Sequence, residues 1–196
     1  MNDGRVAGIV LAAGESRRFG GAKQLAVHEG RTLLEHVLLR ADEAALDPIV
    51  AVVPVWLSRP ASMDAVRLRW VRNPHPGRGM SHSLKLGLGA VPADCGAVLI
   101  LLGDQPTVAL DTIRAVLTAR GERPIIVARG GGVDAPPVLL ERSQFGRVAE
   151  ASGDTGLRDV LRARPELICA VEVGRHAPDI DTHDDLAALR VENGDG

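Results

Sequence analysis

The sequence is poor in the residues that mark several common kinds of protein. It has only two cysteines, Cys95 and Cys169, in 196 residues, and it has no tyrosine. Two cysteines without metal-ligand spacing exclude a disulfide framework and a cysteine-rich metal site, so we expect two free, buried thiols. The net charge is −2 and no long basic stripe occurs, so the charge distribution does not favour binding of nucleic acid.

Long apolar runs are missing as well. No run reaches the roughly 20 residues that span a bilayer. The N-terminus carries charges at Asp3 and Arg5 before a short apolar run that ends in glycine, which is unlike a signal peptide. These absences predict a cytoplasmic protein without a membrane partner. The length and the apolar content of 45% suit one globular domain over residues 1–196.

The sequence does contain a regular alternation of strand and helix patterns. We expect buried strands at residues 6–11, 49–53, 97–102, 125–128 and 167–173, and a half-exposed strand at residues 66–70. We expect helices that begin at Thr32 and near Thr182, helices at residues 81–90, 109–120, 144–151 and 156–164, and a loop or crossover at 130–137. This order predicts an α/β fold, a three-layer, Rossmann-like structure whose mainly parallel sheet is covered by helices. Ligands of such sheets bind outside the carboxyl ends of the strands.

The loop after the first expected strand, residues 11–23 (LAAGESRRFGGAK), is the strongest functional signal. Its three glycines let the backbone turn sharply, and successive N–H groups in such a loop can hold an anion. Arg17, Arg18 and Lys23 add positive charge, which suits a triphosphate. The loop is not a P-loop, because Gln24 follows Lys23, and it lacks the G-x-G-x-x-G dinucleotide fingerprint. A glycine-rich turn with a solvated basic face is the alternative that the composition leaves open.

The loop resembles the signature L-A-A-G-x-S-x-R-x-G-x-x-K of nucleotidyltransferases with a glycosyltransferase-A-like fold. The residues in register are Leu11, Ala12, Ala13, Gly14, Ser16, Arg18, Gly20 and Lys23. In that family the loop wraps the base and the triphosphate of the nucleotide. The resemblance therefore implies that Arg18 and Lys23 are catalytic residues that hold phosphates and stabilise the charge of the leaving pyrophosphate.

Three aspartates follow expected strands and are candidates for a metal site. Asp104 follows the most apolar strand, and Asp179 and Asp181 stand in D-I-D-T before the last expected helix. From the residues alone, each aspartate could equally well be a Mg²⁺ ligand or a turn or helix-cap residue. The resemblance implies the metal, because the family places one ligand in a segment like L-x-D-Q-P and a second before a T-P-E-D-L-like helix. Asp104, which would also be catalytic, and Asp181 are therefore the expected Mg²⁺ pair.

Further segments resemble the molybdenum cofactor cytidylyltransferases of the MobA-like nucleotidyltransferase family. That subgroup carries N-x-x-x-x-x-G-M-S-x-S-L, D-Q-P, G-D-x-G-x-R and D-I-D-T segments, and all four have counterparts here. By its residues alone, the segment at 79–84 is better explained as a capped helix start. One departure is Pro136, where the subgroup usually has a histidine before its acceptor region. The nucleotide-binding residues implied by the resemblance are Leu11, Ala12, Ala13, Gly14, Ser16, Arg18, Lys23, Asn73, Gly79, Ser81, Ser83 and Asp104, and the implied acceptor-binding residues are Gln105, Pro106, Asp154 and Arg158.

The resulting hypothesis is a Mg²⁺-dependent nucleotidyltransferase. A terminal phosphate oxygen of the acceptor, which the resemblance implies to be molybdopterin cofactor, attacks the α-phosphorus of CTP, and pyrophosphate leaves. This nucleophile is already ionised, so no general base is expected. The product would pass to molybdoenzyme maturation proteins. The alternatives are a relative that uses GTP or another triphosphate with a different phosphorylated acceptor, and a non-catalytic nucleotide-binding protein; a nicotinamide-dependent oxidoreductase is disfavoured by the missing fingerprint.

Overall fold

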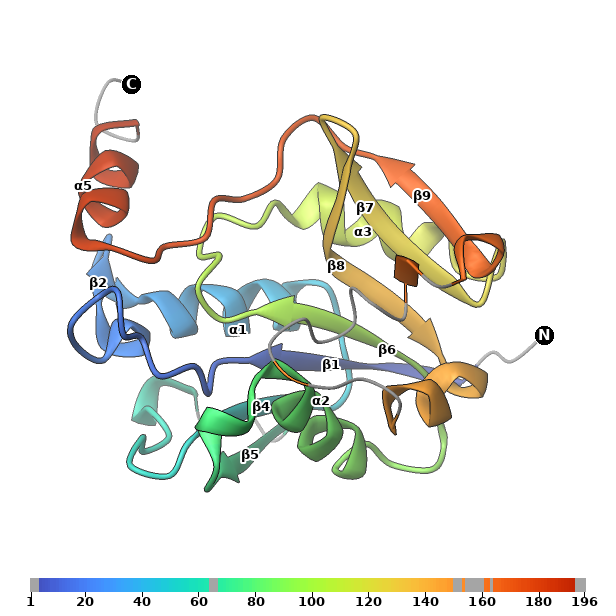
Figure 1. Ribbon diagram of the computed structural model, residues 1–196, viewed down its shortest axis with the longest axis horizontal. Helices are drawn as coiled ribbons and strands as arrows, with labels where there is room; N and C mark the ends of the chain where they lie inside the picture. Colours follow the sequence, from blue (N-terminus) through green and yellow to red (C-terminus); the bar gives the residue numbers. More distant parts are fainter. Residues whose placement is uncertain (1–3, 64–66, 150–152, 154–160, 163, 193–196) are drawn as a thin grey trace.

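A computed structural model describes residues 4–63, 67–149, 153, 161–162 and 164–192 of the chain. Its centre is a seven-stranded sheet in the order β5-β4-β1-β6-β8-β7-β9 (Figure 1). All neighbouring pairs are parallel except the two that involve β8, which runs against both β6 and β7. The strands are β1 (Arg5–Leu11), β4 (Ile49–Pro54), β5 (Leu68–Asn73), β6 (Cys95–Leu102), β7 (Ile125–Gly130), β8 (Val133–Glu141) and β9 (Ile168–Glu172), and a small hairpin joins β2 (Val27–His28) to β3 (Arg31–Thr32).

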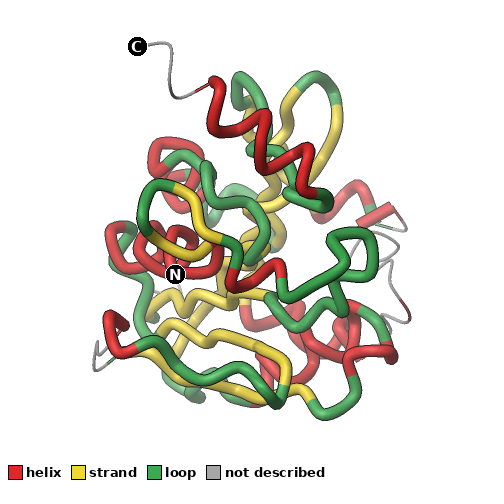
Figure 2. Tube along the Cα trace, turned by 90° about the vertical axis from the view of Figure 1, so that its left-hand side faces the viewer, coloured by secondary structure: helices red, strands yellow, loops and turns green. Residues whose placement is uncertain are grey.

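Helices cover both faces of this sheet, which confirms the predicted three-layer α/β fold (Figure 2). On one face, α1 (Leu33–Glu43) and α3 (Leu110–Thr118) pack against alternate residues of the central strands. On the other face lie α2 (Met80–Gly89) and the 3₁₀ segment η4 (Arg142–Ala149). The remaining elements are α5 (His183–Glu192) and short 3₁₀ turns at η1 (Lys23–Leu25), η2 (Ala61–Met63), η3 (Pro76–Arg78) and η6 (Pro165–Leu167).

The apolar runs of the central strands follow from this double covering. In β1, Val10 packs toward α1 and α3, whereas Ile9 packs toward α2, and both are fully buried. Strands that are buried on both faces need no polar alternation, so they appear in the sequence as continuous apolar runs. The edge strand β5 is more exposed, as its alternating arginines predicted. It begins at Leu68, and residue 66, where the strand was expected to begin, lies outside the described residues.

The helix starts at Thr32 and Thr182 are confirmed by their capping contacts. The Thr32 side chain accepts a hydrogen bond from the Glu35 amide, and the Glu35 carboxylate accepts one from the Thr32 amide, which completes a capping box. At the start of α5, Thr182 and Asp185 exchange the same pair of bonds. These contacts span three residues, so the sequence pattern was sufficient to predict them.

The loop or crossover expected at residues 130–137 is wrong. Gly131 and Gly132, with φ of 58° and 78°, form a tight turn between β7 and β8, and the prolines lie inside β8. The pairing of β8 with β7 shifts between Val127 and Ala128, which leaves Pro136 and Pro137 out of the ladder. Proline has no N–H to donate, so a strand accepts it where the ladder is interrupted.

The expected helix at 144–151 is the 3₁₀ segment η4 over its described part, and most of the expected helix at 156–164 lies outside the described residues. Both cysteines are free thiols, but only Cys95 is fully buried; Cys169 is partly exposed because β9 is an edge strand. No helix in the described ranges is long and apolar enough to cross a membrane.

Candidate functional site

A cavity of about 570 Å³ lies at the carboxyl ends of β1 and β6, where the sheet topology predicts a ligand. The loop at 11–23 forms one wall, the start of α2 forms a second, and the segment before α5 forms a third. Gly103 lets β6 end against this loop, because a Cβ there would lie 2.7 Å from the Ala12 Cβ. That close approach brings the next residue, Asp104, into the cavity wall.

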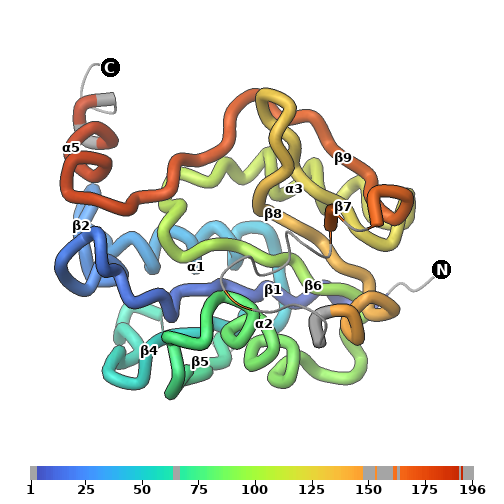
Figure 3. Tube along the Cα trace, in the orientation of Figure 1, coloured from blue at the N-terminus to red at the C-terminus, as the bar shows by residue number. Residues whose placement is uncertain are grey.

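A small apolar cluster joins the loop to the far end of the chain. Phe19 from the loop packs with Ile180 and with Leu186 and Leu189 of α5, and its ring lies 4.1 Å from that of His183. Figure 3 shows the N-terminal loop in blue beside the C-terminal helix in red. The cluster therefore brings Phe19 and Ile180, which are 161 positions apart in the sequence, to one site. Sequence analysis did not predict this contact.

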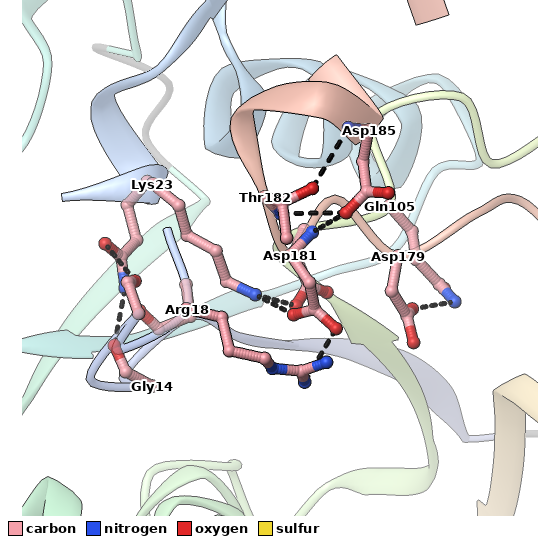
Figure 4. A network of polar contacts seen from close by, with 12 residues as sticks. Gly14, Arg18, Lys23, Gln105, Asp179, Asp181, Thr182 and Asp185 are labelled. Atoms are coloured by element: carbon pink, nitrogen blue, oxygen red, sulfur yellow. Dashed lines mark hydrogen bonds and ion pairs between the residues drawn. The ribbon is translucent and has the colours of Figure 1, made fainter. Parts of the chain in front are cut away.

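Lys23 is the centre of the site's charges. Its ammonium group lies 2.7 Å from an Asp104 oxygen and 2.9 Å from an Asp181 oxygen (Figure 4). The Lys23 side chain is only 12% exposed. Burial alone would lower the pKa of Lys23, but the negative charges of Asp104 and Asp181 and their hydrogen bonds raise it overall. Lys23 is therefore protonated at neutral pH, and it lies in the wall of the cavity.

The two arginines of the loop are far more accessible. Arg18, with a side chain 75% exposed, reaches the second oxygen of Asp181 at 2.7 Å. Arg17, 82% exposed, pairs with Glu15 at 2.6 Å and also lines the cavity. Exposed ion pairs of this kind are weak, so either guanidinium group can turn to an incoming anion at small cost.

The aspartates fit a divalent cation that is completed by a ligand. The Asp104 Oδ1 atom is buried and has no hydrogen-bond partner among the described residues, so one carboxylate oxygen remains available. The described part of the chain offers no group of three or more His, Cys, Asp or Glu side chains arranged to hold a metal. A cation bound here would therefore need phosphate oxygens among its ligands, which is the usual arrangement for Mg²⁺.

Asp179 is a third carboxylate at the cavity wall. Gln105, a buried residue, donates hydrogen bonds to the Asp179 carboxylate at 2.9 Å and to the Ala177 carbonyl at 3.4 Å. Partial burial and the negative charge of Asp104 raise the pKa of Asp179, although the Gln105 bond opposes this. The side-chain amide nitrogen of Gln105 is thus engaged within the protein, and its role toward an acceptor stays a prediction.

The segment at the start of α2 contributes two groups to the cavity. Gly79 and Ser83 line it, whereas Asn73 is fully buried beneath it. The Asn73 amide donates to the Ser83 hydroxyl at 3.0 Å, and its oxygen accepts from the His75 amide at 2.8 Å. Asn73 therefore orients Ser83 and the turn before α2 rather than reaching the cavity itself.

Most of the predicted site residues meet at this cavity. Those that line it are Leu11, Ala12, Ala13, Gly14, Ser16, Arg18, Lys23, Gly79, Ser83, Asp104 and Asp181. Asn73, Ser81, Gln105 and Pro106 do not line it, and Asp154 and Arg158 lie outside the described residues. Sequence analysis gave no role to Gln24, a buried glutamine that also lines the cavity. Its position directly after Lys23 could have indicated that it belongs to the site.

Comparison with known proteins connects this cavity to one family. The family model of the MobA-like NTP transferase domain matches residues 8–168, which include the loop, Asp104 and the start of α2. The chain is 28% identical over 165 residues to the purine catabolism protein PucB of Bacillus subtilis, with 80% of each chain covered. It is also 28% identical over 203 residues to nicotine blue oxidoreductase of Paenarthrobacter nicotinovorans, with 94% of this chain and 96% of that protein covered.

A solved structure extends this likeness to the whole fold. Rv0371c of Mycobacterium tuberculosis H37Rv superposes with a TM-score of 0.84 at 28% identity, covering 96% of this chain and 98% of that one. A structure of Rv0371c in complex with manganese matches with a TM-score of 0.79 at 25% identity, over 96% and 98% of the two chains. A protein of the same fold thus binds a divalent metal ion.

Proposed function

From the premise that the chain belongs to the MobA-like NTP transferase domain family, and is a nucleotidyltransferase, we propose a specific reaction for it. The chain transfers CMP from CTP to the terminal phosphate of molybdopterin cofactor and releases pyrophosphate. The observation that carries the proposal is the Lys23 ammonium between Asp104 and Asp181, on the floor of a cavity rimmed by the loop. A buried cation beside two carboxylates, at the wall of a cavity, suits a metal-bound triphosphate.

The chain's own residues would do most of the work by positioning. Arg18 and Lys23 hold phosphate oxygens and stabilise the negative charge that develops on pyrophosphate as it leaves. A bound Mg²⁺, held by Asp104 and Asp181, supplies further neutralisation of phosphate charge. Ser83 and the loop backbone hold the nucleoside part. The attacking phosphate oxygen is already ionised, so the proposed reaction needs no general base.

The choice of CTP and molybdopterin rests on the segments that resemble the cytidylyltransferase subgroup. Gly79 and Ser83 line the cavity as nucleotide-binding residues of that subgroup would. Pro136 is the point of departure, since a histidine usual in the subgroup is absent and proline offers no side-chain polar group. We therefore expect the acceptor to be held by backbone groups or by other side chains near β8.

The experiment is a panel of the four ribonucleoside triphosphates with Mg²⁺. Thermal unfolding with each triphosphate identifies the preferred base, because a ligand that binds only the folded state raises the melting temperature. Pyrophosphate release with molybdopterin, read against Asp104→Asn protein as the blank, then tests transfer. CTP preference with acceptor-dependent release is the expected result.

Other outcomes identify the alternatives. A preference for GTP would overturn the cytidylyl assignment. Tight CTP binding without pyrophosphate release would indicate a nucleotide-binding protein without this transferase activity. Oxidation of a reduced nicotinamide by the protein, without pyrophosphate release, would instead indicate a nicotinamide-dependent oxidoreductase.

A further inference from the structure

Gln24 is the most deeply buried polar side chain of the loop region, at 4% exposure, and no role follows for it from the chemistry above. Its amide nitrogen donates hydrogen bonds to the Ala12 carbonyl at 2.9 Å and to the Gly14 carbonyl at 2.8 Å. Its amide oxygen accepts a longer bond, 3.4 Å, from the Ser16 hydroxyl. One side chain thus holds three points of the loop. We propose that Gln24 is a positioning residue that aims the Ala13 and Glu15 backbone amides into the nucleotide cavity; this rests on the proposed function of that cavity.

The geometry of the peptide bond carries this inference. In a trans peptide, the carbonyl of one residue and the N–H of the next point in opposite directions. Because Gln24 holds the Ala12 carbonyl, the Ala13 N–H points away from Gln24. Because it holds the Gly14 carbonyl as well, the Glu15 N–H points to the same side. Figure 4 shows Gly14, whose carbonyl accepts one of these hydrogen bonds, at the edge of the site.

Neither of the two amides that this arrangement orients has a hydrogen-bond partner among the described residues. Neither the Ala13 nor the Glu15 N–H donates a hydrogen bond to any described residue, whereas the preceding Ala12 N–H donates to the Val52 carbonyl at 2.8 Å. Ala13 is only 3% exposed, and buried N–H groups in proteins almost always have a partner. Both residues line the cavity, so a bound nucleotide would supply the missing acceptors.

The chemistry of the side chain explains why glutamine is needed. Its NH₂ group offers two donors to two carbonyls, and its oxygen faces a hydroxyl donor. A glutamate of the same shape would place a negative oxygen against the Ala12 and Gly14 carbonyls. A methionine of similar length would fill the space but would donate no hydrogen bond. Gln24 also follows Lys23 directly, so one short 3₁₀ turn fixes both the loop backbone and the cation of the site.

The test compares Gln24→Met and Gln24→Glu with a matched buried glutamine, Gln144. Within the described part of the chain, the side chain of Gln144 bonds to its neighbours Ser143 and Arg147. We expect both Gln24 variants to raise the KM for the triphosphate roughly 10- to 100-fold, the equivalent of one or two hydrogen bonds. The KM for the acceptor should stay within about twofold, and Gln144→Met should change neither value. A purely structural role would lower the amount of active protein without changing either KM.

A second measurement on the unaltered protein covers the case in which the variants do not fold. Addition of the preferred triphosphate to ¹⁵N-labelled protein should shift the Ala13 and Glu15 amide signals strongly. Folded Gln24→Met protein with an unchanged triphosphate KM, or amide signals that do not move in the saturated wild type, would overturn the inference and leave the proposed function intact. A wild type that binds no triphosphate would instead overturn the proposed function.

Discussion

The two ends of the central sheet carry the same arrangement of charges, one cation between two aspartates. At the amino ends of the strands, Arg5 contacts Asp47 at 3.0 Å and Asp94 at 2.6 Å. At the carboxyl ends, Lys23 contacts Asp104 at 2.7 Å and Asp181 at 2.9 Å. Strand β6 even has an aspartate at each end, Asp94 just before it and Asp104 just after it. Ion pairs alone therefore do not tell a functional site from a structural contact.

What differs is the surroundings of the two cations. The Arg5 side chain is 48% exposed, whereas the Lys23 side chain is 12% exposed and lies on the floor of a cavity. Water competes with the Arg5 pairs and weakens them. At Lys23 the charges are partly removed from water, and one Asp104 oxygen has no partner in the described structure. Burial beside an open cavity, with donors and acceptors left over, is the physical mark of a site.

The largest difference between the two ends should appear with Asp104→Asn and its control Asp94→Asn. The first removes a carboxylate charge from the site, so we expect transfer to fall about 1,000-fold, the size of effect seen when a transition-state contact is lost. The second should leave transfer unchanged. Steady-state pyrophosphate release, with circular dichroism to check folding, measures both. An active Asp104→Asn protein would contradict the site.

Lys23→Met should affect transfer and metal binding in opposite directions. Loss of the phosphate-binding cation should slow transfer about 100-fold. Without triphosphate, however, Asp104 and Asp181 would lose the neutralising charge of Lys23, and only the exposed Arg18 would still pair with Asp181 among the described residues, so Mn²⁺ should bind at least roughly tenfold more tightly. Electron paramagnetic resonance of free Mn²⁺ measures this. The chain has one other lysine, the exposed Lys85, and Lys85→Met should behave as wild type. Unchanged Mn²⁺ affinity in Lys23→Met would show that the lysine does not compete with the metal.

Asp179→Asn should stabilise the metal-free protein slightly at neutral pH. Partial burial and the Asp104 charge raise the pKa of Asp179, so its ionised form is disfavoured in the folded state. Its contribution to stability is present below its ordinary pKa and is lost as the pH rises through the raised value. Removing the charge should thus raise the melting temperature by no more than about a few degrees at pH 7. The gain should vanish in acid, where wild-type Asp179 is protonated; a gain that persists there would have another cause.

Arg5→Met should have the smallest effect. We expect full transfer activity and a slightly lower urea midpoint at neutral pH, because the pair is exposed. The hydrogen bond from Arg5 lowers the pKa of Asp94 below its ordinary 3.8, so this contribution is present above that value and is lost as the pH falls through the lowered one. The two proteins should therefore become equally stable in strong acid. A marked loss of transfer activity would show that Arg5, at the amino ends of the strands, also contributes to the reaction.

Several features were predictable because they depend on residues close together in the chain. The capping contacts of Thr32 and Thr182 span three residues, and the buried strands appear as continuous apolar runs. The loop at 11–23 was recognisable for the same reason. The prolines at 136 and 137 were misleading, because local rules assign proline to loops whereas here a bulge beside β7 accommodates it.

The order of residues along the chain is enough to establish an α/β fold, its family and a loop that suits a triphosphate. It does not establish which charges meet, since Lys23 contacts partners 81 and 158 residues away. Those contacts form because parallel strands end at one edge of the sheet and because Phe19 packs against Ile180 and α5. The role of Gln24 is likewise visible only when the loop has folded back over it. Long-range packing and the direction of peptide groups, which no local pattern encodes, convert a recognisable segment into a site.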